Sequence, residues 1–277
     1  MRSWSFAKGH GTRNDFVIVA DRHGLVPVTE EDVRFLCDRR VGIGGDGLLR
    51  VTMASSIPEW EGPGDVWFMD YRNADGSIAE MCGNGLRVFA RYLMENNLVP
   101  VTEHFDVGTR AGLRRIWPQL DGSIRTAMGR VGLAPEPVPV TTGETSWQAT
   151  KVDVGNPHAV VLLDPSDELA ELDLSKAPSV RAEDYPHGTN VEFVQARGER
   201  HVAMRVHERG AGETMSCGTG TVAAAAAYCR AQGLADGQVR VDVLGGTVVV
   251  GLADGEATLT GPAVLVASGE VLLPDSL

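Results

Sequence analysis

Cys82-Gly-Asn-Gly85 and Cys217-Gly-Thr-Gly220 place one pattern, a cysteine followed by Gly-Xaa-Gly, in each half of the chain. Other segments repeat around this pattern. In chain order, the matching residues are 14–19 with 156–161, 45–48 with 188–191, 66–71 with 201–206, and 73–76 with 208–211. Because these correspondences keep the same order and nearly the same spacing, they indicate an internal duplication.

The duplication predicts two domains, and 277 residues are enough for two cores at ~100–200 residues per domain. We expect residues 1–128 to form an N-terminal domain that carries Cys82, and residues 129–262 to form a C-terminal domain that carries Cys217. Residues 263–277 are expected to return to the first domain. The Pro-rich residues 134–140 exclude a regular helix just after the junction and indicate a boundary region or an edge strand just inside the second half.

Short β-branched or apolar runs bounded by Gly, Pro, Asn or Asp predict strands. They are residues 16–20, 152–154, 159–163, 191–194, 201–206, 239–243 and 247–252. Helices are fewer: residues 29–38 begin with a threonine N-cap and an acidic turn, and a helix follows each repeated cysteine. The first has apolar residues at helical spacing (Leu86, Phe89, Ala90 and Leu93), and the second is nearly all alanine over residues 222–227.

A helix with such small side chains can be enclosed closely on every side. The predicted fold class is therefore α+β, with two pseudo-symmetric domains from the duplication. Each domain is expected to be a curved, mostly antiparallel, barrel-like sheet wrapped around one central helix. The active site is expected in the cleft between the domains.

Composition excludes several classes of protein. No run approaches the ~18 apolar residues of a membrane span, and residues 1–10 lack the apolar stretch of a signal peptide, so we expect a cytoplasmic protein. The formal net charge of −12 disfavours nucleic acid as a partner. The four cysteines form no CxxC pair and no zinc spacing, which predicts free thiols and no metal site.

The two repeated cysteines stand where backbone N–H groups at a helix start attract anions. This position favours thiolate over thiol and can hold a substrate carboxylate beside the sulfur. Inverting a carbon centre needs one base and one acid on opposite faces, a role that two equivalent thiols can share. We therefore predict that Cys82 and Cys217 exchange one proton of an amino acid. Cys37 and Cys229 are interpreted as packing residues.

The segment Gly42-Ile-Gly-Gly-Asp-Gly47 fits the GxGxxG pattern of dinucleotide-binding proteins. That pattern requires a preceding strand and a following helix. No strand is predicted before it, and the residues after it read as a strand. We interpret its glycines as a tight turn.

In these residues and their order, the chain resembles the diaminopimelate epimerase family over essentially its whole length. The segments that carry the resemblance are residues 11–17, 39–47, 72–76, 81–87, 154–158, 188–192, 208–214 and 216–220. The resemblance implies interconversion of LL- and meso-2,6-diaminopimelate without pyridoxal phosphate, in lysine and peptidoglycan precursor synthesis, by a homodimer.

The resemblance also implies roles for individual residues. Cys82 and Cys217 look like the two acid/base groups, and His158 and Glu208 like neighbours that tune the thiol pKa values. The implied substrate-binding residues are Asn14, Asn73, Gly83, Asn84, Asn156, Asn190, Glu208, Arg209, Gly218 and Thr219. One departure is Gly47, where many family members carry glutamine.

Two alternatives use the same cysteines. A proline or hydroxyproline racemase-like enzyme would leave the Asn-rich set and Arg209 without a purpose. A two-cysteine thiol redox protein would instead cycle Cys82 and Cys217 through a disulfide. Exchange of the substrate α-proton with solvent separates the redox reading from both epimerase readings.

Overall fold

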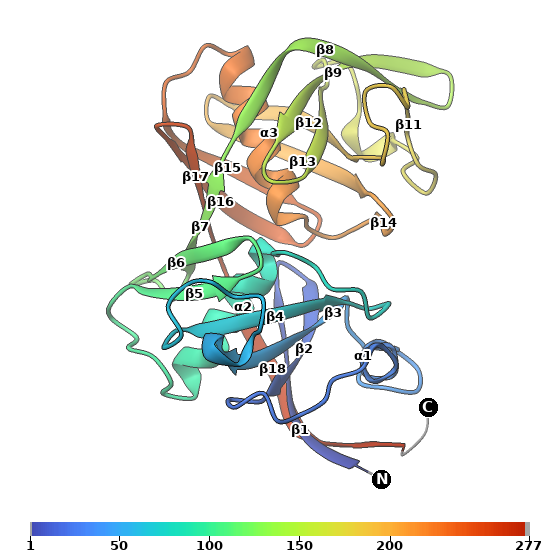
Figure 1. Cartoon of the computed structure of the whole chain (residues 1–277). Coiled ribbons are helices and arrows are strands. Elements are labelled where there is room, and N and C mark those ends of the chain that lie inside the picture. The colour runs from blue at the N-terminus through green and yellow to red at the C-terminus, as the bar shows by residue number, and fades with distance from the viewer. Residues whose placement is uncertain (1, 275–277) are drawn as a thin grey trace. The chain divides into compact units, whose positions relative to one another are not determined.

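The computed structural model describes residues 2–274, and the chain forms two compact units (Figure 1). Unit 1 consists of residues 2–126 and 262–274, and unit 2 of residues 127–261. The junctions expected after residues 128 and 262 thus lie within two residues of these divisions. No helix among the described residues is long and apolar enough to cross a bilayer.

Unit 1 contains curved sheet strands in the order β18-β1-β2-β3-β4-β5-β6-β7, and the last of these, β7, continues past residue 126 into unit 2. These strands are β1 (Arg2–Gly11), β2 (Asn14–Ala20), β3 (Gly47–Met53), β4 (Trp67–Asn73), β5 (Phe105–Thr109), β6 (Gly112–Pro118), β7 (Ile124–Arg130) and β18 (Val264–Leu273). The pairs β2–β3 and β4–β5 are parallel, and the others are antiparallel. The last strand, β18, pairs with the first along most of its length.

Unit 2 contains a second sheet with the order β11-β8-β9-β10-β12-β13-β15-β16-β17. Its strands are β8 (Gly132–Thr142), β9 (Thr145–Asp153), β10 (Pro157–Leu162), β11 (Ser179–Val180), β12 (Asn190–Gly198), β13 (His201–Glu208), β15 (Gly237–Val243), β16 (Gly246–Ala253) and β17 (Glu256–Gly261). The short β14 (Gly212–Glu213) pairs with the end of β13. The pairs β10–β12 and β13–β15 are parallel.

The two sheets repeat one topology. Read from β18 in unit 1 and from β8 in unit 2, successive pairs have the same order of antiparallel and parallel contacts. One long helix follows the fifth strand in each series: α2 (Gly83–Glu95) after β4 in unit 1, and α3 (Gly218–Ala231) after β13 in unit 2. The repeat in the sequence therefore corresponds to a repeated arrangement of strands, and the α+β fold with two similar domains is confirmed.

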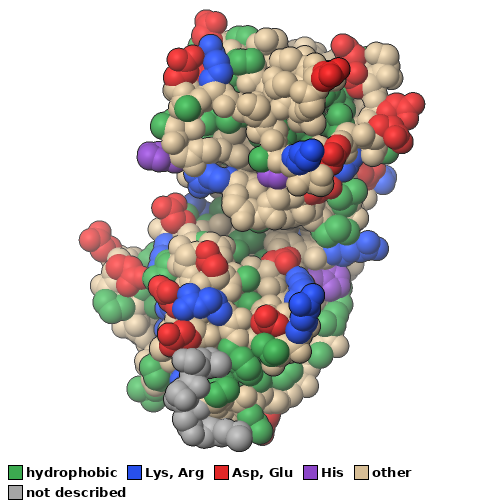
Figure 2. Space-filling view, turned by 90° about the vertical axis from the view of Figure 1, so that its right-hand side faces the viewer, with side chains coloured by type: hydrophobic (Ala, Val, Ile, Leu, Met, Phe, Trp, Pro, Cys, Tyr) green, Lys and Arg blue, Asp and Glu red, His purple; other side chains and the backbone are tan. Residues whose placement is uncertain are grey.

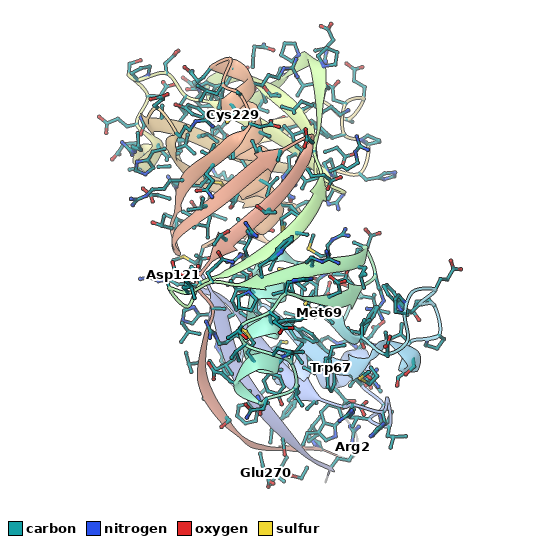
Figure 3. The ribbon with its side chains drawn as sticks, turned by 90° about the vertical axis from the view of Figure 1, so that its left-hand side faces the viewer. Arg2, Trp67, Met69, Asp121, Cys229 and Glu270 are labelled. Carbon is teal, nitrogen blue, oxygen red and sulfur yellow. The ribbon has the colours of Figure 1, made fainter. Side chains whose placement is uncertain are left out.

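Helix α2 packs against the concave side of its sheet. Its predicted core residues Leu86, Phe89, Ala90 and Leu93 are all fully buried. Trp67 and Met69, two residues apart on β4, belong to the same core cluster (Figure 3). Since side chains alternate along a strand, residues of one face meet α2 together.

Strand β2 is apolar without alternation because both faces of the sheet are covered. Phe16 and Ile18 belong to the core with α2. Val17 and Val19 pack on the opposite side with helix α1 (Glu30–Cys37). The predicted N-cap Thr29 begins α1 in a capping box with Asp32. The remaining helices are two 3₁₀ turns, η1 (Ala54–Ser56) and η2 (Leu169–Glu171).

Helix α3 is buried continuously from Thr221 to Cys229. It packs against strands on several sides, including β9, β10, β12, β13, β16 and β17. Alanine lets these strands approach the helix closely, and interiors are close-packed. The enclosed central helix expected from the alanine run is confirmed.

Replacing Ala224 by Leu should destabilise the protein, because the fully buried side chain has no room for three more carbon atoms. Overpacking of this kind costs about 1–3 kcal/mol. Urea unfolding followed by circular dichroism measures the change. Ala231→Leu, at the exposed end of the same helix, is the matched control and should change stability by less than about 0.5 kcal/mol. Equal effects of both substitutions would contradict the enclosed packing of α3.

Candidate functional site

Cys82 and Cys217 occupy the same local position, the N-cap of a long helix. Cys82 has φ −138° and ψ 118°, and Cys217 has φ −113° and ψ 118°. Each sulfur accepts a hydrogen bond from the backbone N–H three residues later, of Gly85 or Gly220, at 3.4 Å. In both units a sulfur satisfies an amide that Ser or Asp usually caps. The helix dipole at this position favours negative charge on the sulfur.

The first turns of the two helices are both closely packed, but against different groups. A Cβ on Gly85 would lie 3.3 Å from the Leu49 side chain. A Cβ on Gly220 would lie 2.5 Å from Oε1 of Glu192. The missing side chain at Gly220 therefore lets a carboxylate approach the first turn of α3.

In unit 1, Cys82 lies next to a hydrogen-bond network that fixes the orientation of two side-chain amides, those of Asn14 and Asn84. The Cys82 thiol lies 3.7 Å from Oδ1 of Asn14, which also accepts from Asn84 Nδ2 at 3.2 Å. Arg87 can only donate, and it donates to Asn84 Oδ1 at 2.8 Å. At the other end, Asp46 accepts from Asn14 Nδ2 at 2.7 Å. Asp46 and Arg87, at the two ends of this network, thus orient the side-chain oxygen of Asn14 toward Cys82.

Arg87 is a fully buried cation on α2, and the sequence analysis gave it no role. Its guanidinium donates to Asn84, to the Thr12 hydroxyl and to the carbonyls of Gly83 and Pro262. No carboxylate among residues 2–274 forms an ion pair with it. Burial lowers the pKa of Arg87 to about 10, and negative charge on Cys82 opposes that change. A charged residue inside an apolar helix face was the signal that could have identified it.

Asn73 lies in a separate turn. Its Oδ1 accepts from the Tyr71 hydroxyl at 2.9 Å, and its Nδ2 donates to Ser77 Oγ at 3.0 Å. Gly47 pairs with Asn73 across β3 and β4. A Cβ on Gly47 would lie 2.7 Å from the Tyr71 ring and 2.6 Å from the Arg72 carbonyl oxygen. The Tyr71 ring therefore occupies the space beside Gly47.

In unit 2, Cys217 is buried near two carboxylates. Its sulfur lies 3.6 Å from the Thr219 hydroxyl. Burial raises the pKa of Cys217 well above its ordinary value, and the charges of Glu208 and Glu192 raise it further. Burial also raises the pKa of Glu208, although hydrogen bonds with Thr214 and Cys217 oppose this. The surroundings of Cys217 therefore favour its thiol over its thiolate.

His158, on β10, forms a buried pair with Glu192 on the neighbouring strand β12. His158 Nδ1 lies 2.7 Å from Glu192 Oε1, and both side chains are fully buried. The other ring nitrogen, Nε2, lies 3.0 Å from Asn156 Oδ1. Of these three residues, Glu192 was missed as a functional candidate. Its position inside an apolar strand was the available signal.

Asn190 and Arg209 form a neighbouring contact at the ends of β12 and β13. Asn190 Oδ1 accepts from the Arg209 backbone N–H at 2.9 Å. The Arg209 guanidinium donates to the His187 carbonyl at 3.3 Å, and its side chain is exposed. Asn190 is also the residue opposite His158 in the parallel β10–β12 pair. The predicted residues of unit 2 thus gather around the ends of β10, β12 and β13 and the start of α3.

Outside this set, the other two cysteines are buried thiols. Burial raises the pKa of Cys37 to about 12 and also raises that of Cys229, which lies near the end of α3 (Figure 3). Within the described part of the chain, no group of three or more His, Cys, Asp or Glu side chains could hold a metal ion. On the face drawn in Figure 2, acidic and basic side chains are interspersed in both units.

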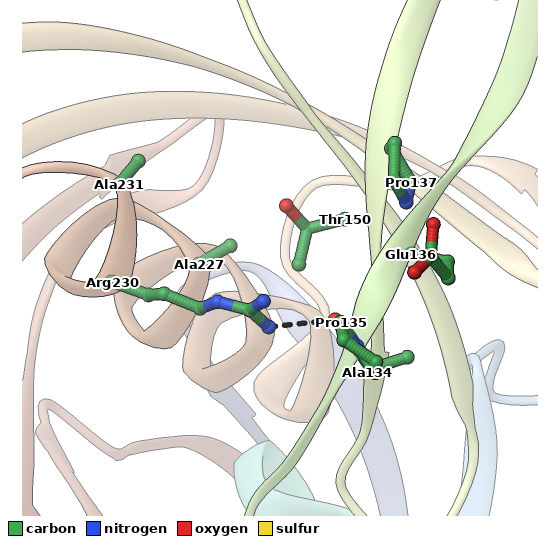
Figure 4. A pocket seen from close by; sticks show the side chains of 8 residues that line it. All are labelled: Ala134, Pro135, Glu136, Pro137, Thr150, Ala227, Arg230 and Ala231. Atoms are coloured by element: carbon green, nitrogen blue, oxygen red, sulfur yellow. Dashed lines mark hydrogen bonds between the residues drawn. The ribbon is translucent and has the colours of Figure 1, made fainter.

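A pocket of about 180 Å³ lies at the opposite end of α3 from Cys217 (Figure 4). Ala227, Arg230 and Ala231 line it together with the Pro-rich part of β8. The Arg230 guanidinium already donates to the Ala134 carbonyl at 2.6 Å. No predicted site residue lines this pocket.

Comparison with known proteins adds independent findings. The sequence model described as "Diaminopimelate epimerase" matches residues 6–134 and 150–266. The diaminopimelate epimerase of Streptomyces coelicolor is 50% identical over 276 residues, covering 96% of this chain and 94% of the relative. That of Thermobifida fusca is 49% identical, covering 97% and 98%.

Solved structures share the fold at low sequence identity. A hydroxyproline epimerase from Agrobacterium vitis has a TM-score of 0.69 and 16% identity, and the alignment covers 99% of this chain and 94% of that one. A PhzF-family phenazine biosynthesis protein from Bacillus anthracis has a TM-score of 0.69 and 17% identity, covering 99% and 100%. These two comparisons concern the fold alone.

Cys82 should react with iodoacetamide faster than Cys217. At about pH 7.5, below the ordinary thiol pKa of ~8.5, half-buried Cys82 should be alkylated first. Cys217 should react slowly, because its raised pKa leaves little thiolate, and its rate should increase as the pH rises above 9. Peptide mass spectrometry measures the order, and protein unfolded in urea is the control. Equal rates at Cys217 and Cys82 in the folded protein would contradict the assigned environments.

Proposed function

The chain belongs to the diaminopimelate epimerase family, and we propose that it interconverts LL- and meso-2,6-diaminopimelate by moving one α-proton without pyridoxal phosphate. The relatives at 49–50% identity over nearly their whole length support this substrate. The observation that carries the mechanism is the pair of equivalent sulfur N-caps on α2 and α3.

Cys82 and Cys217 are the two acid/base groups of the proposed reaction. A thiolate on Cys82 takes the α-proton from one face of the carbon. The Cys217 thiol, which is held protonated, gives its proton to the opposite face, so the products are a Cys82 thiol and a Cys217 thiolate. The reverse reaction uses the same groups with their roles exchanged. This chemistry requires both sulfurs to reach opposite faces of one carbon.

The first-turn amides of the two helices are proposed to bind the carboxylate at the reacting centre. They belong to Gly83 and Asn84 in α2 and to Gly218 and Thr219 in α3. As the α-proton leaves, negative charge moves from the carbon onto this carboxylate. Amides already oriented toward that charge stabilise the transition state more than the ground state.

Glu208 and His158 are proposed to tune the thiols. The Glu208 carboxylate contacts Cys217 and accepts from Thr214, so it favours a proton on the sulfur. Asn14, Asn73, Asn156, Asn190 and Arg209 are proposed to recognise the amino-acid end of the substrate that does not react. We also propose a homodimer in the cytoplasm.

The racemase alternative is not favoured. The hydroxyproline epimerase shares the fold at 16% identity, whereas the diaminopimelate epimerases match at about three times that identity. The redox alternative predicts no exchange of substrate protons.

In heavy water, the wild-type protein should incorporate deuterium at the α-carbon of diaminopimelate. Cys82→Ala and Cys217→Ala should each lower the exchange rate by at least about 10²-fold, the usual minimum for loss of a general acid or base. Proton NMR or mass spectrometry of the substrate measures this. Cys229→Ala, on the same helix as Cys217 but near its other end, is the matched control and should retain exchange. Turnover of peroxide without deuterium incorporation would support the redox alternative instead.

The two-face requirement predicts a second result. Mild oxidation without substrate should join Cys82 and Cys217 in a disulfide, because thiols that flank one carbon can meet when that carbon is absent. Activity should fall and return with dithiothreitol, and the crosslinked peptide should appear in non-reducing mass spectrometry. Irreversible inactivation with no Cys82–Cys217 crosslink would count against the proposed arrangement.

A further inference from the structure

Glu192 joins three elements of unit 2 at one buried point. It lies on β12, next to β10, which carries His158, and its Oε1 approaches the first turn of α3 through the space left by Gly220. Register explains the pairing: His158 is opposite Asn190, and Val160 is opposite Glu192. The carboxylate and the imidazole are both fully buried and 2.7 Å apart.

The contact decides which ring nitrogen carries a proton. A carboxylate can only accept, so the hydrogen on this contact belongs to His158 Nδ1. The Nε2 edge faces the Asn156 side-chain oxygen at 3.0 Å, which also only accepts, so the two contacts hold the ring from both sides. A carboxylate that fixes one nitrogen of an imidazole in this way determines what the other nitrogen can do.

The charge of Glu192 also reaches the groups around it. It raises the pKa of Cys217, of Glu208 and of Tyr185, after the larger effect of burial in each case. Tyr185 contacts the same pair, because its hydroxyl donates a hydrogen bond to the His158 carbonyl. The titratable groups that face Glu192 are therefore His158, Cys217, Glu208 and Tyr185.

Burying Glu192 in this place lowers the stability of the fold. Its second oxygen, Oε2, is buried and has no hydrogen-bond partner among the described residues. An unsatisfied buried acceptor destabilises a fold, more so when the group is charged. A glutamine or an apolar residue would fill the same space with less charge to bury.

We infer that Glu192 is a positioning residue for the proposed reaction: it keeps a proton on His158 Nδ1, holds the ring with Nε2 facing Asn156, and places its charge beside the first turn of α3, where Cys217 lies. The inference rests on the proposed function for its role in turnover. The protonation of His158 and Cys217 can be measured without any substrate.

The test compares wild-type protein with Glu192→Gln, which keeps the shape and removes the charge. Loss of one negative charge should shift the His158 titration, followed by imidazole NMR, to lower pH. It should also shift the pH dependence of Cys217 alkylation to lower pH. The kcat for diaminopimelate should fall at least about tenfold with little change in KM. A purely structural role would leave both titrations in place.

Asp242→Asn is the matched control. Asp242 lies in the same unit and pairs with His201 at 2.6 Å, at the start of β13 and not at the end that carries Glu208. It should leave the Cys217 profile and kcat unchanged. If Glu192→Gln fails to fold, Glu192→Asp retains the charge while withdrawing it by one carbon, and should lower kcat with a smaller shift of the two titrations.

One measurement needs no variant: nitrogen NMR of wild-type His158 should show hydrogen on Nδ1. A bare Nδ1, or unchanged His158 and Cys217 titrations in Glu192→Gln, would overturn the inference. Wild-type protein that folds but does not turn over diaminopimelate would instead overturn the proposed function, while the two titrations would still decide the role of Glu192.

Discussion

The contact between a sulfur and the backbone amide three residues later is the interaction on which the rest of the site depends. It occurs at Cys82 and at Cys217 with nearly the same backbone angles and the same 3.4 Å distance. Each helix is held in place by burial on the concave side of a curved sheet. The sheet thus sets the position of the helix, and the helix start sets the position and charge preference of the sulfur.

The two units repeat a backbone but not an electrostatic environment. Cys82 lies beside a network that ends in the buried cation Arg87, whereas Cys217 lies beside the carboxylates of Glu208 and Glu192. The proposed reaction needs the two cysteines in opposite protonation states when the substrate arrives. The repeated fold supplies equivalent positions, and the different neighbouring side chains would supply that inequality.

Features encoded by local sequence could be predicted, and features set by strand register could not. The cysteines at two helix starts, the threonine N-cap Thr29 and the alanine helix depend on residues within one turn of each other, and all were found in the structure. The pair of His158 and Glu192 depends on which residues of two parallel strands lie side by side. No spacing along the chain reveals that register, so Glu192 was missed.

The return of β18 to pair with β1 has a consequence for how the protein is made. Unit 2 is one continuous segment, so it has all its strands once residue 261 has left the ribosome. Unit 1 is completed only by β18, which is synthesised after the whole of unit 2, although its other strands precede unit 2. Since domains generally fold as units during translation, the second half of this chain can fold before the first. A nascent chain halted before β18 would present the unpaired edge of β1 to other proteins in the cell.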